Sequence, residues 1–447
     1  MFREHGTELW KCKRVKLVYV TPRYGTEVIG GAESGARMIA ERVASQLGWD
    51  VEVLTSCALQ SSTWENEYPV GEVEIGGVKV RRFATEFPRS SEFNHTSFLC
   101  HNNPKLAPLE LQERWVDEQG PYAPELLDAI ADSDADVVAF YPYLYYPTIR
   151  GLQRVKNSAV SVMHPAAHDE ASIKMSIFAE TFGAADAFVW HTDGERRIVE
   201  DLFSIADRPQ ILLGLGVEAG DGDPQAFRAK FGIGDAPYVL CLGRMDKGKG
   251  SHSLVEYFAE YKKRHPSPLK LVFVGPVIQP LDEESDDVIV AGLVSPEEKW
   301  GALRGCQVLI SPSPFESFSL VLLEAWMAEK PVLVNKHCVA TVEHVSRSKG
   351  GLWFGGYADF DVSLEKLLSG DALASAMAHA GKAYVEENFA WPSLIARYGS
   401  FLEALVQRKN ASQKRSAKDG QVVDQMNDQA NDQTNDQTNY QVKGTRS

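Results

Sequence analysis

The sequence lacks the features that mark secreted, membrane-spanning and nucleic-acid-binding proteins. Its six cysteines are scattered over 447 residues without a Cys-x-x-Cys pair, which suggests neither a zinc site nor a redox pair and fits a reducing compartment. No run approaches the roughly 20 apolar residues of a membrane span, and the N-terminal segment has no signal-peptide core. A formal net charge of -15 argues against a surface that follows nucleic-acid phosphates. We therefore expect a cytoplasmic protein, free or held peripherally at the inner face of the membrane, with no nucleic-acid partner.

The composition is that of a folded protein, with 44% hydrophobic and 24% charged residues. Short apolar segments alternate with amphipathic ones, a pattern typical of parallel α/β sheets. The chain is long enough for two such domains. Strands are expected in the first half at 16–21, 51–55, 136–141, 159–163 and 187–192, and in the second half at 237–243, 269–275, 287–292, 307–312 and 331–335.

The expected domain boundaries follow from composition. A first Rossmann-like domain covers residues 1–213, and a Gly- and Asp-rich stretch at 214–235 reads as a flexible interdomain linker. A second Rossmann-like domain follows at 236–391. Residues 411–447 end in a polar near-repeat at Asn427–Thr438, and we expect this tail to be disordered because it is too polar to build a core.

The most informative motif lies at Ser311–Trp326, where a strand leads into a helix that carries Glu316 and Glu324. The first carboxylate falls in the loop or in the first turn of the helix, and the second lies two turns deeper. Two Glu at this spacing also arise by chance, so the pair alone is weak evidence. The unpaired backbone N–H groups of a helix start form a site for an anion such as a diphosphate. Here they belong to Ser317, Phe318, Ser319 and Leu320.

A cationic loop follows the first strand of the second domain, with Arg244 and Lys249 among glycines at Gly243–Gly250. The carboxyl ends of parallel strands are where α/β sheets bind ligands, so these cations are candidates to neutralise phosphate. A solvated surface loop is the alternative.

A glycine-containing loop, Thr21–Glu33, leads from the first strand into the first helix. Gly30 and Gly31 allow a ligand to approach the backbone closely. The loop lacks the Gly-x-Gly-x-x-Gly pattern of dinucleotide sites, and a plain helix-entry turn is the alternative.

Two histidines, His164 and His168, lie four residues apart in the segment His164–Glu170. Pro165 argues against a shared helix face and hence against a metal pair. We expect His168 to point from its loop into the cleft, with a structural histidine as the alternative. We predict no required metal.

Together these motifs resemble the retaining, GT-B-fold glycosyltransferases of family 4, also called group 1. Their order and spacing match the family pattern over residues 16–407. The resemblance implies two Rossmann-like domains that face each other across a cleft, with a helix at 392–410 that crosses back onto the first domain. The carriers are Gly30–Glu33, His168–Glu170, Gly216–Glu218, Gly243–Gly250 and Pro314–Val334.

The resemblance also implies roles for individual residues. Glu316 would face the donor sugar, Glu324 would hold the ribose, and Arg244 and Lys249 would bind the diphosphate. His168 would contact the sugar near its 6-position. Further donor contacts would come from Gly30, Gly31, Leu293, Ser317, Phe318, Ser319 and Leu320. Many relatives have glycine where this chain has Ser319, which bears on how closely phosphate approaches there.

The implied activity is that of a retaining, metal-independent hexosyltransferase without a cofactor. It would move sugar from a nucleotide-diphosphate sugar to a hydroxyl on a small-molecule, glycan or lipid-linked acceptor. Two alternatives stay open: another enzyme on the same architecture, such as an epimerase or phosphorylase, and a non-catalytic GT-B protein that binds nucleotide sugar or serves as a scaffold.

Overall fold

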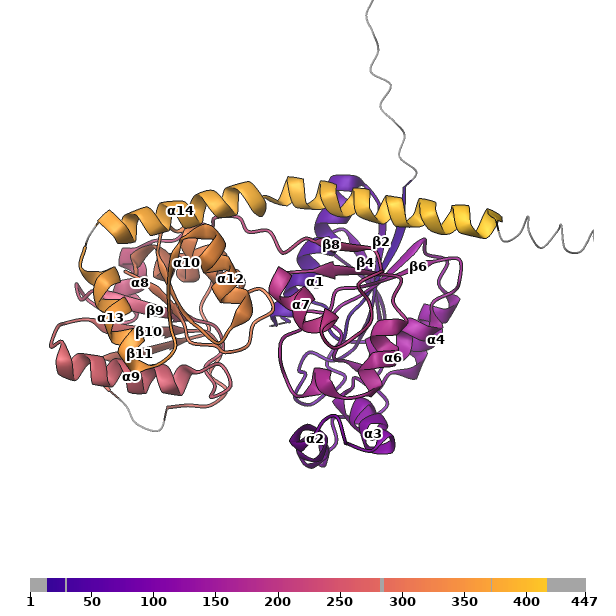
Figure 1. Cartoon of the computed structure of the whole chain (residues 1–447), viewed down its shortest axis with the longest axis horizontal. Helices are drawn as coiled ribbons and strands as arrows, with labels where there is room; N and C mark the ends of the chain where they lie inside the picture. Colours follow the sequence, from indigo (N-terminus) through magenta and orange to yellow (C-terminus); the bar gives the residue numbers. More distant parts are fainter. Residues whose placement is uncertain (1–13, 29, 282–284, 371, 416–447) are drawn as a thin grey trace, which may run out of the picture.

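The computed structural model describes residues 14–28, 30–281, 285–370 and 372–415. Two α/β units lie side by side, joined along one side by a long helical segment near the C-terminal end of the described chain (Figure 1). Each unit is built on its own, mostly parallel sheet. The prediction of two Rossmann-like domains is therefore confirmed.

The first sheet has eight strands, all parallel to their neighbours except β3, which runs antiparallel to β4. In spatial order its strands are β3 (Gly71–Ile75), β4 (Val78–Phe83), β2 (Asp50–Ser56), β1 (Lys16–Val20), β5 (Val137–Phe140), β6 (Val160–Met163), β7 (Ala187–Trp190) and β8 (Gln210–Leu212). Its helices are α1 (Gly31–Arg42), α2 (Phe93–Asn102), α3 (Leu109–Gln119), α4 (Pro124–Asp132), α5 (Tyr146–Gly151), α6 (Ile177–Gly183) and α7 (Asp193–Glu200).

The second sheet has six parallel strands. In spatial order they are β11 (Val288–Gly292), β10 (Lys270–Val274), β9 (Tyr238–Leu242), β12 (Leu309–Ser311), β13 (Val332–Asn335) and β14 (Gly351–Phe354). Its helices are α8 (Pro224–Lys230), α9 (Ser251–Arg264), α10 (Pro296–Gly305), α11 (Leu320–Met327), α12 (Val339–Ser348), α13 (Tyr357–Leu368) and α14 (Ala372–Asn388).

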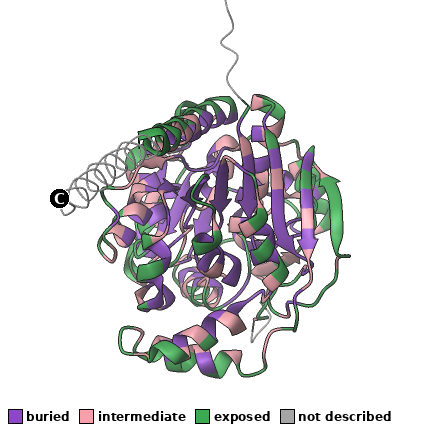
Figure 2. Ribbon diagram, turned by 90° about the vertical axis from the view of Figure 1, so that its right-hand side faces the viewer, coloured by how far each residue is buried: buried purple, intermediate pink, exposed green. Residues whose placement is uncertain are grey.

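Helices cover both faces of each sheet, which is why the central strands are continuous apolar runs. Strand β1 illustrates this, because Leu17, Val18, Tyr19 and Val20 are all fully buried. In Figure 2 the strands are largely buried, while exposed residues lie on the surrounding helices and at one edge of the sheet. Each of the ten expected strands overlaps an observed one.

The interdomain stretch differs from the expected flexible linker. Its second half contains helix α8, which packs on α10 of the second domain with Phe227 buried. Asp223 caps this helix by accepting a hydrogen bond from Gln225 N (2.8 Å). A Cβ on Gly222 would lie 2.2 Å from Gly301 N, so glycine at 222 reflects close packing against α10. The prediction of a flexible linker over 214–235 is wrong from residue 223 onward.

A helix at 391–415, called here the cross-over helix, returns to the first domain (Figure 1). Tyr398, fully buried, meets Tyr19 and His164 of the first domain, with O–O and O–N distances of 2.8 and 2.9 Å. The helix extends through residue 415, so 411–415 are helical rather than part of the expected tail; residues 416–447 lie outside the described part of the chain. Among the described helices, none combines the length and apolar character that a membrane crossing requires.

Candidate active site

The loops that follow the strands bring the two domains into contact at their facing ends. The His168 ring lies 5.7 Å from the Phe315 ring of the second domain. Thr192, the residue before α7, donates a hydrogen bond from Oγ1 to Ser317 O across the same boundary (3.2 Å). The carboxyl ends of parallel strands are the usual ligand side of such sheets, so this boundary is the candidate site.

Glu316 and Lys249 are in direct contact there. Lys249 Nζ donates to Glu316 Oε1 over 2.7 Å, and both side chains are half-buried. The loop that carries the lysine is shaped by Asp246, which accepts from Lys249 N at 2.7 Å and lies 3.3 Å from Arg244 Nε. Arg244 is 56% exposed. The site therefore holds two cations, each beside a carboxylate, and Arg244 is the more exposed of the two.

The start of α11 adds uncapped backbone donors beside this pair. The helix begins at Leu320, after Ser319 in a left-handed conformation with φ 72°, and no side chain caps it. Its first N–H groups lack intrahelical partners, and the helix dipole adds partial positive charge. The positive φ explains why glycine suits position 319, since other residues pay a steric cost there. The Ser319 hydroxyl is buried without a hydrogen-bond partner.

Glu324 lies in the second turn of α11 and pairs with Lys299 of α10, whose Nζ donates to its Oε1 at 2.7 Å. Leu293 follows β11 and is largely exposed, just before the Ser295 cap of α10. Lys299 was not predicted from the sequence. Its place on a helix shortly after Leu293 offered no motif that would have singled it out.

Gly30 and Gly31 lie at the start of α1, on the first domain. A Cβ on Gly30 would be 2.2 Å from Glu33 Oε2, whereas one on Gly31 would meet nothing within 4 Å. Glu33 is buried and paired with the buried Arg23, whose Nε donates at 3.0 Å. Gly30 is thus required by packing, while Gly31 presents open backbone. Within the described residues, no polar contact joins these two glycines to Glu316 or Lys249.

His168 sits on the loop after β6, partly exposed, and its Nδ1 has no hydrogen-bond partner. Glu170 accepts from Tyr143 OH at 2.7 Å and lies 3.7 Å from His168 Nδ1. His164, by contrast, is fully buried, and burial holds its pKa well below the ordinary value. The two histidines point to different environments. Across the described residues, no cluster of three or more His, Cys, Asp or Glu is arranged to hold a metal ion.

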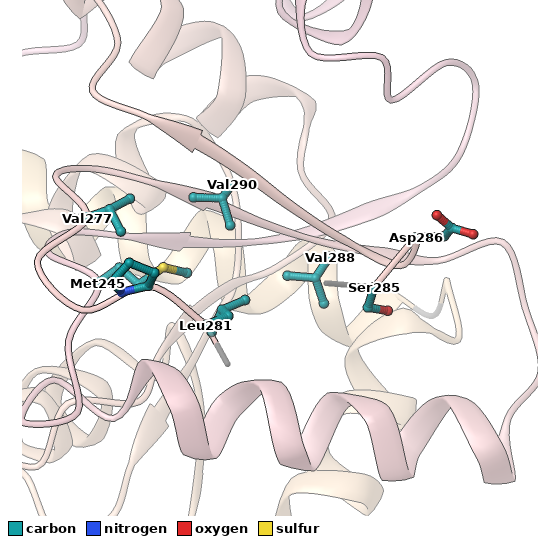
Figure 3. Close-up of a pocket in the computed structure, with 8 residues that line it drawn as sticks. Met245, Val277, Leu281, Ser285, Asp286, Val288 and Val290 are labelled. Atoms are coloured by element: carbon teal, nitrogen blue, oxygen red, sulfur yellow. The ribbon is translucent and has the colours of Figure 1, made fainter. Parts of the chain in front are cut away.

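A cavity of about 540 Å³ lies elsewhere, beside the edge strand β11 of the second sheet (Figure 3). It is bordered by β11 and by the segment after β10, and none of the predicted site residues lines it. Met245, next to Arg244 in sequence, is its nearest link to the candidate site. The lining residues are Met245, Val277, Pro280, Leu281, Ser285, Asp286, Val288 and Val290.

Proteins of similar sequence and structure are known for this chain. A family model described as "Glycosyl transferases group 1" matches residues 223–384. Sucrose-phosphate synthase from Thermosynechococcus elongatus superposes with a TM-score of 0.66 at 17% identity, covering 88% of this chain and 100% of that one. Anabaena HepE, solved with UDP and glucose, gives a TM-score of 0.62 at 14% identity and covers 88% and 100%. The chain has the GT-B fold of these structures, and its residues 223–384 match the group 1 glycosyltransferase family.

Curated relatives of this GT-B chain match it in part. A D-inositol 3-phosphate glycosyltransferase of Acidothermus cellulolyticus is 28% identical over 297 residues, 60% of this chain and 64% of the relative. A GDP-mannose-dependent alpha-(1-6)-phosphatidylinositol monomannoside mannosyltransferase of Mycolicibacterium smegmatis is 28% identical over 211 residues, 43% and 55%. The chain thus spans less than two thirds of the length of these relatives.

Proposed function

We propose that the protein is a retaining, metal-independent hexosyltransferase that takes a nucleotide-diphosphate sugar as donor and a hydroxyl group as acceptor. The observation that carries this proposal is the convergence of Arg244, the Lys249–Glu316 pair and the uncapped start of α11 at the domain boundary. Cations and helix-start amides at one point suit a diphosphate. A carboxylate beside them suits the hydroxyls of the attached sugar.

The proposed mechanism follows from where charge develops. In the transition state the sugar becomes oxocarbenium-like and the departing diphosphate gains negative charge. Arg244, Lys249 and the α11 amides stabilise that charge without a metal, while Glu316 and His168 hold the sugar. The family resemblance supports retention, with attack from the leaving-group face and the leaving phosphate accepting the acceptor's proton. Closure of the two domains excludes water and limits hydrolysis.

The first test measures the binding of nucleoside diphosphates and nucleotide sugars by the shift that they cause in the thermal unfolding of the protein. A ligand of the folded state at about 100 times its Kd stabilises by about 2.7 kcal/mol. We expect a shift for one nucleotide family, and binding roughly 10–100-fold weaker in Arg244→Ala, since hydrogen bonds to charged groups contribute about 1.5–3 kcal/mol. Arg264→Ala, a paired surface arginine at the end of α9, is the matched control. Absence of any shift would favour the non-catalytic scaffold.

Turnover then separates transfer from the other enzymes on this architecture. Donor consumption with an acceptor-linked sugar supports transfer, and the anomeric configuration of the product, read by NMR, tests retention. Activity that survives a chelator supports metal independence. Relatives named for inositol phosphate and phosphatidylinositol monomannoside acceptors make those two compounds the first acceptors to try, with UDP- and GDP-sugars as donors.

For a lipid-linked acceptor, the favoured location is the cytoplasmic face of the membrane, with peripheral contact through the tip of the first domain. Helices α2 and α3 project from the side opposite the cross-over helix (Figure 1). There Phe98 is 65% exposed and Leu106 77% exposed. In a liposome flotation assay, we expect the wild-type protein to float with the liposomes and the double variant Phe98→Ser/Leu106→Ser to stay in the unbound fraction. Val362→Ser, which alters an exposed apolar residue of the second domain, is the control.

A further inference from the structure

The loop that carries His168 adopts a costly conformation. Ala166, two residues before it, has φ 52°, in the left-handed region. This conformation disfavours a non-glycine residue by about 1–2 kcal/mol. Such a conformation persists only where surrounding contacts hold it.

A contact to helix α7 holds this loop, because Ala167 N donates a 2.8 Å hydrogen bond to Glu195 Oε1. The other carboxylate oxygen, Oε2, accepts from His191 N at 2.7 Å and lies 3.2 Å from His191 Nδ1. The Glu195 side chain is 0% exposed. It lies in the first turn of α7, where the helix dipole favours a carboxylate. A buried anion thus faces backbone and imidazole donors and fastens the His168 loop to α7.

The second partner of Glu195 is itself held in place. His191 Nε2 lies 2.6 Å from Tyr141 OH. A His191 ring with its proton on Nδ1 donates to Glu195 and accepts from Tyr141, so one arrangement satisfies all three groups. The His191 ring also lies 6.0 Å from the ring of Phe318, in the loop that follows Glu316. The carboxylate therefore holds two backbone N–H groups of the first domain, those of Ala167 and His191, by short, buried contacts.

We propose that Glu195 is a positioning residue that sets His168 for contact with the donor sugar. It touches neither sugar nor phosphate, and it acts through Ala167 N. The inference rests on the proposed function for the sugar contact. The position of His168 itself can be tested without it.

The direct test compares the imidazole NMR signals of full-length wild type and Glu195→Gln. The His168 signal is assigned by its loss in His168→Ala. In the variant an amide replaces one acceptor, so we expect the His168 signal to shift or broaden while that of His379, exposed on α14, stays in place. Glu195→Asp keeps the charge at the α7 start but shortens the reach by one methylene, and serves if Glu195→Gln folds poorly. An unchanged His168 signal in both variants overturns the proposal.

Kinetics give the second readout. We expect Glu195→Gln to lower kcat/KM for the nucleotide sugar roughly 10–100-fold, because small misplacements of a contacting group have effects of that size. Affinity for the nucleoside diphosphate, whose proposed contacts do not include His168, should stay within about twofold. The double variant Glu195→Gln/His168→Ala should be no slower than His168→Ala alone. Additive losses, or loss of nucleotide affinity, would show a general structural role and overturn the proposal.

Glu118→Gln, which changes a poorly exposed, ion-paired carboxylate on α3, is the matched control and should keep wild-type kinetics. The proposed function and the inference fail in different ways. A wild-type protein that binds no nucleotide and transfers no sugar defeats the proposed function, while the His168 signal still decides the role of Glu195.

Discussion

At position 319 a serine occupies a backbone conformation that suits glycine. Its φ of 72° and its buried, unpartnered hydroxyl both raise the free energy of the folded state. Ser319→Gly removes both terms at the cost of a more flexible unfolded chain. We expect a net gain of about 1 kcal/mol in the free energy of unfolding, measured by urea denaturation.

The control for this variant is Ser317→Gly, two residues earlier. Ser317 is not one of the described residues with a positive φ. There only the entropy cost of glycine remains, so a loss of about 0.5–1 kcal/mol is expected. Equal effects of the two substitutions would contradict the strain at position 319.

His344 of α12 gives a pH dependence with a defined sign. Burial, together with the charge of Arg347, lowers its pKa to about 3. The unfolded chain binds a proton at this position below about pH 6.5, and the folded chain does not. The stability contributed by neutral His344 is therefore full above pH 6.5. It is lost as the pH falls toward 3, by up to about 1.4 kcal/mol per pH unit.

Urea denaturation between pH 7.5 and 4.5 checks this expectation. His344→Gln should lose stability less steeply than wild type on acidification, because glutamine does not titrate. His379→Gln, exposed on α14, should keep the wild-type slope. Parallel curves for all three proteins would remove His344 from the account of acid sensitivity.

At the scale of one element, a substitution at the start of α1 is expected to affect stability and binding differently. A methyl group on Gly31 has open space around it, and alanine is favoured over glycine in a helix by about 0.5–1 kcal/mol. Gly31→Ala should therefore leave the melting temperature unchanged or higher. The methyl group blocks close approach of a ligand to the backbone, so we expect nucleotide-sugar affinity to fall roughly 10-fold, or about 1.4 kcal/mol.

Titration calorimetry with Gly183→Ala as the control measures this effect. Gly183, at the end of α6, also has open space around a Cβ and lies in a first-domain helix. It should bind donor as wild type does. A Gly31→Ala protein with full affinity would place the diphosphate away from the start of α1.

Strands were predictable from the sequence where apolar residues form continuous runs. Strands in which apolar and charged residues alternate were harder to predict. The hairpin β3–β4 was missed, although its charged and apolar residues alternate and Gly76 and Gly77, both with positive φ, form its turn. That pattern is a recognised hairpin signal. Helix α8 was missed because glycine and aspartate at 214–223 resembled a loop, and only the packing of Phe227 on α10 shows otherwise.

The sequence predicted which residues belong to the candidate site. It did not predict which of their side chains pair with one another. Motif order placed Glu316 and Lys249 in one site, and the structure puts them 2.7 Å apart. The Lys299–Glu324 pair and the support of the His168 loop by Glu195 depend on side chains from separate elements. Their spacing in sequence carries no signal for such contacts. The roles of these residues remain predictions.

At the scale of the whole molecule, the last described helix stabilises the first domain. Leu402 of the cross-over helix is fully buried and belongs to the cluster that includes Tyr19 and Val53. Leu402→Ala should lower the free energy of unfolding by about 2–5 kcal/mol. Hydrogen exchange should speed up at amides of β1 and β2, although these lie far away in sequence. Gln407→Ala, exposed on the same helix, should leave exchange unchanged.

The same arrangement sets an order of events during protein synthesis. The cross-over helix is made after β8 has emerged, once about 200 further residues have been translated, which takes roughly 10–40 s at about 5–20 residues per second. During that interval the nascent first domain exposes the surface around Tyr19 and His164 that Tyr398 later covers. The half of the molecule made first therefore completes its folding only then, and it should depend on chaperones until the cross-over helix has emerged from the ribosome.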